Sequence, residues 1–443
     1  MKIRFVTLGC KLNFAESSAI GKALLQRGHT RAKQGEEADI CVINTCSVTD
    51  NADHKDRQTI HRIHRQNPNA IIIVTGCYAQ LQPEQIAQIE GVDYVLGQNE
   101  KYEITQLVDK IERLRDSLED ASLQDAASGY SLKAQKIRVA NIREVEEFHG
   151  AYSKDDRTRC FLKVQDGCNY FCTYCTIPYA RGKSRNPAIS DIIKDAQEAI
   201  SQGAKEIILT GVNIGDFGRS TGESFLELLR ALDGLEAKGE RREAKGMDYR
   251  IRISSCEPNL LTDEIIDFVA QSKHFAPHFH IPLQSGSNEV LSIMKRRYTR
   301  ELFEERVQHI KQVMPHAFIG VDCMVGVRGE TEECFNDYVD FIKRLDVSQL
   351  HVFTYSERAN TRMLELDVCI VPKAERQRRS KILHEISEEK TRTFYANQIG
   401  REAIVLWESK KEGDQMAGFT ENYVKVHRPY DKAKVNTFEV IRL

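Results

Sequence analysis

Three short runs of β-branched and aliphatic residues open the chain, and amphipathic stretches separate them. The runs are KIRFVTL (2–8), DICVINT (39–45) and AIIIVT (70–75), with a stretch of helical periodicity at 16–26. Apolar runs that alternate with helical segments are typical of parallel β-α-β units. A further run at 92–96 predicts a fourth strand. We therefore expect a doubly wound α/β domain over residues 1–118.

The middle of the chain repeats this alternation on a larger scale. Residues 119–150 contain few large apolar residues and are predicted to form a linker. Six strand candidates follow, namely CFLKVQ (160–165), EIILTG (206–211), RIRISS (250–255), HFHIPL (278–283), FIGVDCMVG (318–326) and LHVFTY (350–355). Six βα units predict a partial (β/α)6 barrel over residues 151–372, smaller than the closed eight-unit form.

The pattern changes again after Pro372. A strongly charged helical stretch leads into short alternating segments such as EAIVLWES and FEVIRL, which predict a small antiparallel β-barrel over residues 373–443. This region holds 15 Lys/Arg and 11 Asp/Glu, whereas the whole chain has a formal charge of −2. The local basic bias indicates either a nucleic-acid contact or an ordinary solvated surface.

Composition narrows the class of protein. The 443 residues are 41% hydrophobic and 29% charged, and no apolar run approaches the ~20 residues of a membrane span. The start, MKIRFVTLGC, lacks the features of a secretory signal. We therefore expect a cytoplasmic protein that does not contact the membrane.

Twelve cysteines in such a chain favour metal or redox chemistry over disulfides. Six of them lie in apolar or helical stretches, and most of these six are predicted to be small buried hydrophobes, namely most of Cys41, Cys160, Cys256, Cys323, Cys334 and Cys369. Cys10, Cys46 and Cys77 instead each follow a predicted strand, in LGC, NTC and TGC. Ligand sites form outside the carboxyl ends of parallel strands, so these three thiols are expected to converge.

The remaining three cysteines lie in DGCNYFCTYC, at Cys168, Cys172 and Cys175. The spacing C-x3-C-x2-C, directly after the first barrel strand, can bind three irons of a [4Fe-4S] cube and leave the fourth iron open. The alternative is a zinc knuckle. A closed zinc site needs four ligands, and His149 lies too far upstream to be the fourth.

This spacing and the surrounding residues resemble those of the radical S-adenosylmethionine (SAM) methylthiotransferases, and the resemblance covers the whole chain. It implies a second [4Fe-4S] cluster on Cys10, Cys46 and Cys77, which lie in TLGCKLN, INTCSVT and VTGCYAQ. It also implies a C-terminal, RNA-binding TRAM domain that includes ENYVKV (421–426). The expected cofactors are two [4Fe-4S] clusters and SAM.

The resemblance also implies SAM contacts. Tyr174 is expected beside the adenine, the TGVN residues Gly211, Val212 and Asn213 near the methionine part, and Gly326 near the adenine. Glycine at a strand end permits close approach of the backbone, but it is equally common in plain βα turns.

Two basic groups are candidates for binding the anticodon stem-loop of tRNA. Arg57, Arg62 and Arg65 lie on a predicted helix after Cys46, whereas Arg181, Lys183 and Arg185 follow the cysteine loop. Both groups have the charge needed to bind phosphates. For the first group a solvated helix face is the alternative.

The segment GCKLNFAES, with Lys11, Asn13 and Glu16, is similar to the family members that act on threonylcarbamoyladenosine. The expected reaction is methylthiolation of N6-threonylcarbamoyladenosine at position 37 of tRNA, with a sulfur donor and a reductant such as flavodoxin or ferredoxin. The alternatives are methylthiolation of isopentenyladenosine in tRNA, methylthiolation of a ribosomal-protein aspartate, and a non-catalytic iron-sulfur protein that binds RNA.

Overall fold

The computed structural model describes residues 1–33, 35–120, 136–153, 158–235 and 248–443. Its internal contacts divide the chain into two compact units. Unit 1 comprises Met1–Ser153 and Cys175–Lys183, and unit 2 comprises Lys154–Tyr174 and Ser184–Leu443. The segment Cys175–Lys183 therefore packs with the N-terminal residues, although the predicted boundaries place it within the barrel domain.

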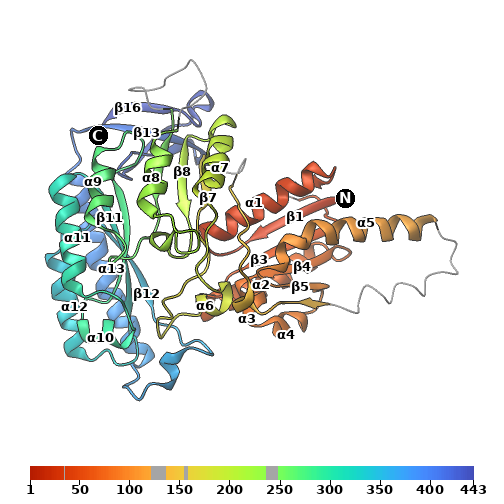
Figure 1. Cartoon of the computed structure of the whole chain (residues 1–443), viewed down its shortest axis with the longest axis horizontal. Coiled ribbons are helices and arrows are strands. Elements are labelled where there is room, and N and C mark those ends of the chain that lie inside the picture. The colour runs from red at the N-terminus through yellow and green to blue at the C-terminus, as the bar shows by residue number, and fades with distance from the viewer. Residues whose placement is uncertain (34, 121–135, 154–157, 236–247) are drawn as a thin grey trace. The chain divides into compact units, whose positions relative to one another are not determined.

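Unit 1 is built on one parallel sheet with the strand order β2-β1-β3-β4-β5-β6 (Figure 1). Its strands are β1 (Lys2–Thr7), β2 (Thr30–Arg31), β3 (Ile40–Thr45), β4 (Ile71–Gly76), β5 (Tyr94–Leu96) and β6 (Ile137–Arg138). Its helices include α1 (Lys11–Gln26), α2 (Asp50–Gln66), α3 (Cys77–Leu81), α4 (Pro83–Ala87), α5 (Ile104–Asp120) and α6 (Ile177–Arg181).

Alternate residues of the central strands bury their side chains on opposite faces of this sheet. Ile40 and Val42 of β3 pack with α1 and α5, whereas Cys41 and Ile43 pack with α2, α3 and α4. The predicted doubly wound α/β architecture and its four parallel strands are confirmed. Residues 121–135 of the predicted linker lie outside the described ranges. Its described part contains β6, which extends the sheet and leaves no periodic pattern because it has only two residues.

Unit 2 contains the six predicted barrel strands. They are β7 (Arg159–Lys163), β8 (Glu206–Thr210), β9 (Arg250–Ile253), β10 (His278–Gln284), β11 (Phe318–Val325) and β12 (Gln349–Thr354). Helices lie between them, namely α7 (Ile189–Ser201), α8 (Phe225–Asp233), α9 (Asp263–Gln271), α10 (Asn288–Ile293), α11 (Arg300–Val313) and α12 (Glu332–Arg344). The strands form two three-stranded parallel sheets, and the isolated bridges Ile251–Phe275 and Ser255–His280 connect them. This arrangement confirms a partial barrel.

The C-terminal part of unit 2 begins with α13 (Lys373–Ala396), which packs against β12. A four-stranded antiparallel sheet follows, with the order β15-β14-β13-β16. Its strands are β13 (Glu402–Glu412), β14 (Gln415–Phe419), β15 (Lys425–Pro429) and β16 (Phe438–Arg442). The small antiparallel module is therefore present, as predicted.

Two arginines of β9 fix this module to the barrel. Arg250 donates to the carbonyl oxygens of Ile404 (3.1 Å) and Phe419 (2.9 Å), and Arg252 donates to that of Glu421 (3.0 Å). Both guanidinium groups also pair with the buried Glu206. Although burial raises the pKa of Glu206, Arg250 and Arg252 outweigh it and hold that pKa well below its usual range. The module and the barrel thus share one buried ionic core.

Five of the six cysteines in apolar or helical stretches are buried, as predicted for most of them, and Cys369 is exposed. Cys369 lies between η7 (Arg362–Glu365) and α13, in a connection where no regular element covers it. Within the described ranges, no helix combines the length and the apolar character that a membrane span requires.

Candidate functional site

The N-terminal cysteine site, defined as Cys10, Cys46 and Cys77, lies at one edge of the unit 1 sheet. Cys10 is the N-cap residue of α1, Cys46 directly follows β3, and Cys77 directly follows β4. The parallel register pairs Thr7 with Asn44 and Asn44 with Thr75, so the three strands end side by side. This register brings together thiols that 35 and 30 residues separate in the sequence.

The backbone near these cysteines is closely packed. Gly9 has a left-handed conformation (φ 96°), and a Cβ atom there would lie 2.7 Å from the Cβ of Cys46. Burial is the largest of the causes, with the neighbouring Cys77 and Cys10 thiols, that together raise the pKa of Cys46 to about 12. Cys46 is half-buried and Cys77 is buried, so charge on their thiolates needs a compensating cation such as iron, whereas Cys10 is exposed.

Three cysteine thiols are the donor set that a [4Fe-4S] cube with one open iron takes from a protein. Among the described residues, no three His, Cys, Asp or Glu side chains converge tightly enough for one metal ion. In a [4Fe-4S] cube three thiolates bind three separate irons, so they need not converge on one point.

The loop motif, defined as Cys168, Cys172 and Cys175, follows β7. Its first two cysteines pack with unit 2 and its third with unit 1. Thr173, which lies between the second and third cysteines, fixes the loop. Its N–H donates to the Met294 carbonyl (3.1 Å) and its hydroxyl donates to the Ile293 carbonyl (2.9 Å). Phe171 has a left-handed backbone (φ 51°), which is strained for a bulky residue. The loop is thus held in one defined conformation.

Arg296 contacts this loop directly and was not predicted. Its guanidinium donates to the Cys172 Sγ atom (3.0 Å) and the Tyr174 hydroxyl (3.5 Å), and it forms an ion pair with Glu257. Burial raises the pKa of the Cys172 thiol, and Arg296 opposes that shift. Nothing in the run Lys295–Tyr298 indicates this contact, because its partners are distant in sequence.

A second residue that was not predicted, Gln165, connects the loop to the next strand. Its Oε1 accepts the N–H groups of Val212 (2.9 Å) and Asn213 (2.8 Å), and its Nε2 donates to the Gly167 carbonyl (2.7 Å). A Cβ atom on Gly211 would lie 2.9 Å from the same Oε1. The predicted TGVN residues therefore adjoin the start of the cysteine loop.

Buried polar atoms at the carboxyl ends of the barrel strands test whether SAM fits there. The Asn213 amide, the Gln284 Oε1 and the Tyr355 hydroxyl are buried without a hydrogen-bond partner of good geometry in the described part of the chain. They follow or end β8, β10 and β12, respectively. Because buried polar atoms are normally paired, these fit a polar ligand at this end of the barrel.

Two other predicted SAM contacts lie in packed surroundings. Tyr174 packs against the apolar cluster that includes Met294. Gly326 has a left-handed conformation (φ 74°), and a Cβ atom there would lie 2.3 Å from Arg376. Packing against Arg376 is therefore sufficient to require a glycine at position 326.

The six predicted RNA-binding residues occupy different surroundings. Arg62, Arg65 and Lys183 are exposed. Arg57 is half-buried and donates to the Tyr78 hydroxyl (2.8 Å). Arg181 and Arg185 are buried and form ion pairs with Glu16 and Asp166, respectively. For these two the phosphate contact stays a prediction, and a phosphate there would compete with a buried ion pair.

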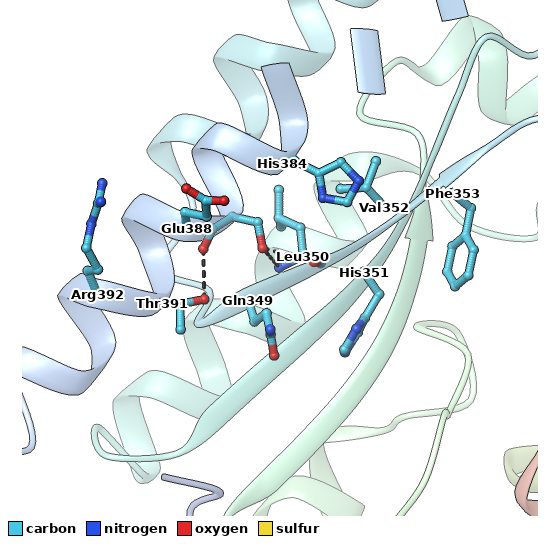
Figure 2. A pocket seen from close by; sticks show the side chains of 10 residues that line it. Gln349, Leu350, His351, Val352, Phe353, His384, Glu388, Thr391 and Arg392 are labelled. Atoms are coloured by element: carbon cyan, nitrogen blue, oxygen red, sulfur yellow. Dashed lines mark hydrogen bonds between the residues drawn. The ribbon is translucent and has the colours of Figure 1, made fainter. Parts of the chain in front are cut away.

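A groove of about 700 Å³ runs between β12 and α13 in unit 2 (Figure 2). The Ser387 hydroxyl bridges the Leu350 N–H (3.0 Å) and carbonyl (2.9 Å), so α13 satisfies part of the unpaired edge of β12. His351, Phe353 and Arg392 also line the groove. None of the cysteines lines it, so it is separate from the predicted site residues.

Comparison with known proteins defines the class of this chain. A model described as "Uncharacterized protein family UPF0004" matches residues 2–97, and the radical SAM superfamily matches residues 162–342. The radical S-adenosylmethionine methyltransferase TsrM from Kitasatospora setae shares the fold, with a TM-score of 0.56 and 16% identity over 79% of this chain and 72% of that chain. The fold and the loop motif thus define a radical SAM protein.

Relatives with named activities identify the family. The threonylcarbamoyladenosine tRNA methylthiotransferase MtaB of Bacillus subtilis (strain 168) is 37% identical over 96% of this chain and 89% of its own length. A tRNA-2-methylthio-N(6)-dimethylallyladenosine synthase of Pelotomaculum thermopropionicum is 31% identical over 94% of this chain and 88% of its own length. The chain belongs to the radical SAM methylthiotransferase family.

Proposed function

We propose that this protein methylthiolates N6-threonylcarbamoyladenosine at position 37 of tRNA, in the anticodon loop. The observation that supports this most strongly is the near-full-length similarity to the Bacillus subtilis enzyme of that name, which exceeds the similarity to the dimethylallyladenosine enzyme. The segment GCKLNFAES is consistent with the same substrate.

The residues that would hold the cofactors are the two cysteine sets, with one [4Fe-4S] cluster on Cys10, Cys46 and Cys77 and another on Cys168, Cys172 and Cys175. A cluster with an open iron supplies one-electron reduction of bound SAM. Gln165 would hold the Gly211–Asn213 turn toward SAM through its two N–H contacts. Arg296 would stabilise the Cys172 thiolate.

The reaction takes place in the cytoplasm, where the tRNA is found, and it needs two further partners. A reductant such as flavodoxin or ferredoxin supplies the electron for SAM cleavage, and a sulfur donor supplies the inserted atom. The C-terminal module and the exposed Arg62, Arg65 and Lys183 supply positive charge for the tRNA backbone.

The experiment that tests this function is nucleoside mass spectrometry of tRNA from a strain that lacks the gene, with and without the gene restored. We expect loss of 2-methylthio-N6-threonylcarbamoyladenosine and accumulation of the unmethylthiolated nucleoside. Loss of the methylthiolated isopentenyl nucleoside instead would assign the other tRNA substrate. A protein that binds tRNA but forms no 5′-deoxyadenosine with SAM and dithionite would support the non-catalytic alternative.

The tRNA contact of the C-terminal module must be tested by surface substitution. Truncation before α13 would leave Arg250 and Arg252 without their carbonyl partners and uncover β12. Lys410, Lys411 and Lys432 are exposed, so their replacement by alanine leaves these contacts intact. We expect weaker tRNA binding and a shallower salt dependence, while SAM cleavage persists. Unchanged affinity and salt dependence would reject this contact.

A further inference from the structure

Five buried polar side chains form a connected network beside the N-terminal cysteine site. We call it the support network, and its members are Asn13, Glu16, Gln98, Lys101 and Arg181. Each is at most 4% exposed. Asn13 and Glu16 come from α1, Gln98 and Lys101 from the segment after β5, and Arg181 from the end of α6. All five belong to unit 1.

The network is centred on Glu16. Arg181 donates to Glu16 Oε1 (3.1 Å) and to Asn13 Oδ1 (2.6 Å). The Lys101 ammonium donates both to Glu16 and to the Gln98 side-chain oxygen. Removal of Glu16 would therefore leave two buried cations without this shared partner.

The network contacts the chain at all three cysteines. The Gln98 amide donates to the Cys77 Sγ atom (3.2 Å). Asn13 donates to the carbonyl oxygens of Leu8 (2.9 Å) and Thr45 (3.0 Å), which lie just before Cys10 and Cys46. Asn13 Oδ1 also lies 3.9 Å from the Cys10 Sγ atom. Asn13 and Glu16, which belong to the segment similar to the threonylcarbamoyl group, are thus internal to unit 1 and fully buried.

Lys101 and Arg181 both donate to the carboxylate of Glu16, so the network places two cations beside the N-terminal cysteine site. Positive charge and N–H donors close to a cluster stabilise its reduced, more negative state, and so raise its reduction potential.

We propose that the support network sets the reduction potential of the N-terminal cluster. Lys101 and Arg181 supply the positive charge, Gln98 supplies an N–H donor to Cys77, and Glu16 with Asn13 holds these groups in place. The inference rests on the proposed function, because it requires a cluster on Cys10, Cys46 and Cys77.

The test isolates this cluster in the full-length chain. In the variant Cys168→Ala/Cys172→Ala/Cys175→Ala, reconstituted without oxygen from iron and sulfide, the N-terminal site is the proposed cluster site that remains. The substitutions Lys101→Met and Gln98→Leu are then introduced separately. A redox titration followed by electron paramagnetic resonance measures the midpoint potential, and an iron assay measures occupancy.

We expect both substitutions to leave about four irons bound and to lower the midpoint potential. For Lys101→Met the expected shift is at least about 59 mV, which is a tenfold change in the one-electron equilibrium constant. For Gln98→Leu the shift has the same direction but is smaller. Lys110→Met on α5 is the matched control, because Lys110 is exposed and its charge is screened by solvent.

An unchanged potential in both variants, with iron still bound, would overturn the inference. If Lys101→Met does not hold iron, the Gln98→Leu titration decides the question, because this substitution removes no charge. Failure of the parent variant to bind any iron would instead refute the N-terminal cluster and, with it, part of the proposed function.

Discussion

The two cysteine sets of this protein are built in opposite ways. The N-terminal site takes one ligand from each of three βα units, and 35 and 30 residues separate those ligands. The loop motif takes all three ligands from residues 168–175. The dispersed site exists only when the sheet has formed, whereas the compact motif needs only a loop of the right conformation. Formation of the N-terminal site therefore depends on folding of the sheet much more than formation of the loop motif does.

The hydrogen bonds that hold the two cysteine sets in place also differ between the dispersed site and the compact motif. At the N-terminal site, Asn13 binds backbone before two different strand-end cysteines, and Gln98 binds the third. At the loop motif, Gln165 and Thr173 fix the backbone, and Arg296 contacts one sulfur. The first site is held by a network that spans several elements, and the second by separate single contacts.

The largest expected effect separates the chemical roles of the two sets. Cys10→Ala/Cys46→Ala/Cys77→Ala should still form 5′-deoxyadenosine with dithionite and SAM but should make no methylthiolated tRNA. Cys168→Ala/Cys172→Ala/Cys175→Ala should form neither product. Each variant should hold about four irons, compared with about eight in the wild type. Wild-type methylthiolation by the first variant, shown to lack its cluster, would contradict this division of roles.

The next effect concerns stability. Binding one cluster across loops of 35 and 30 residues restricts the unfolded chain far more than binding one across three and two residues. The loop-closure difference is about 4 kcal/mol. Loss of the N-terminal cluster should therefore lower the free energy of unfolding by about this much more than loss of the loop cluster. Anaerobic urea titrations of the two triple-alanine variants measure it. Equal destabilisation of the two variants would contradict this loop-closure argument.

A smaller effect is expected at Gln165. The substitution Gln165→Leu leaves the N–H groups of Val212 and Asn213 without their shared acceptor. We expect a loss of about 3 kcal/mol of stability, together with weaker SAM binding, as measured by urea titration and calorimetry. The control Gln202→Leu, at an exposed position on the protein surface, should change stability by no more than about 0.5 kcal/mol. Unchanged SAM affinity in Gln165→Leu would mean that this turn does not contact SAM.

The smallest effects should come from exposed basic residues associated with each cysteine set. Arg62→Ala/Arg65→Ala tests the helix after Cys46, and Lys183→Ala tests the chain after Cys175. Removing one side chain that binds a phosphate should reduce the slope of log affinity against log salt by about 0.7 to 0.9. Filter binding at several salt concentrations measures this slope. A slope unchanged in one variant alone would show which of the two segments the tRNA does not touch.

The sequence alone predicted the strands that are long enough to show a pattern, the doubly wound sheet and the partial barrel. The two-residue strands β2 and β6 were missed, because register with a neighbouring strand defines them and local periodicity does not. Most of six cysteines were predicted to be buried, but the sequence did not single out Cys369 as the exposed one, since composition does not reveal which connections remain uncovered.

The candidate cysteines followed from local sequence, because strand ends and C-x3-C-x2-C spacing are both visible along the chain. The side chains that contact these cysteines did not follow from local sequence. Arg181 was predicted to face RNA, yet it lies buried against Glu16, and Gln98, Lys101, Gln165 and Arg296 were not predicted at all. Hydrogen bonds between residues far apart in sequence leave no periodic signal. Sequence therefore determined the elements and the metal-binding residue types of this protein, whereas tertiary structure decided which polar groups lie beside them, because only folding brings those partners together.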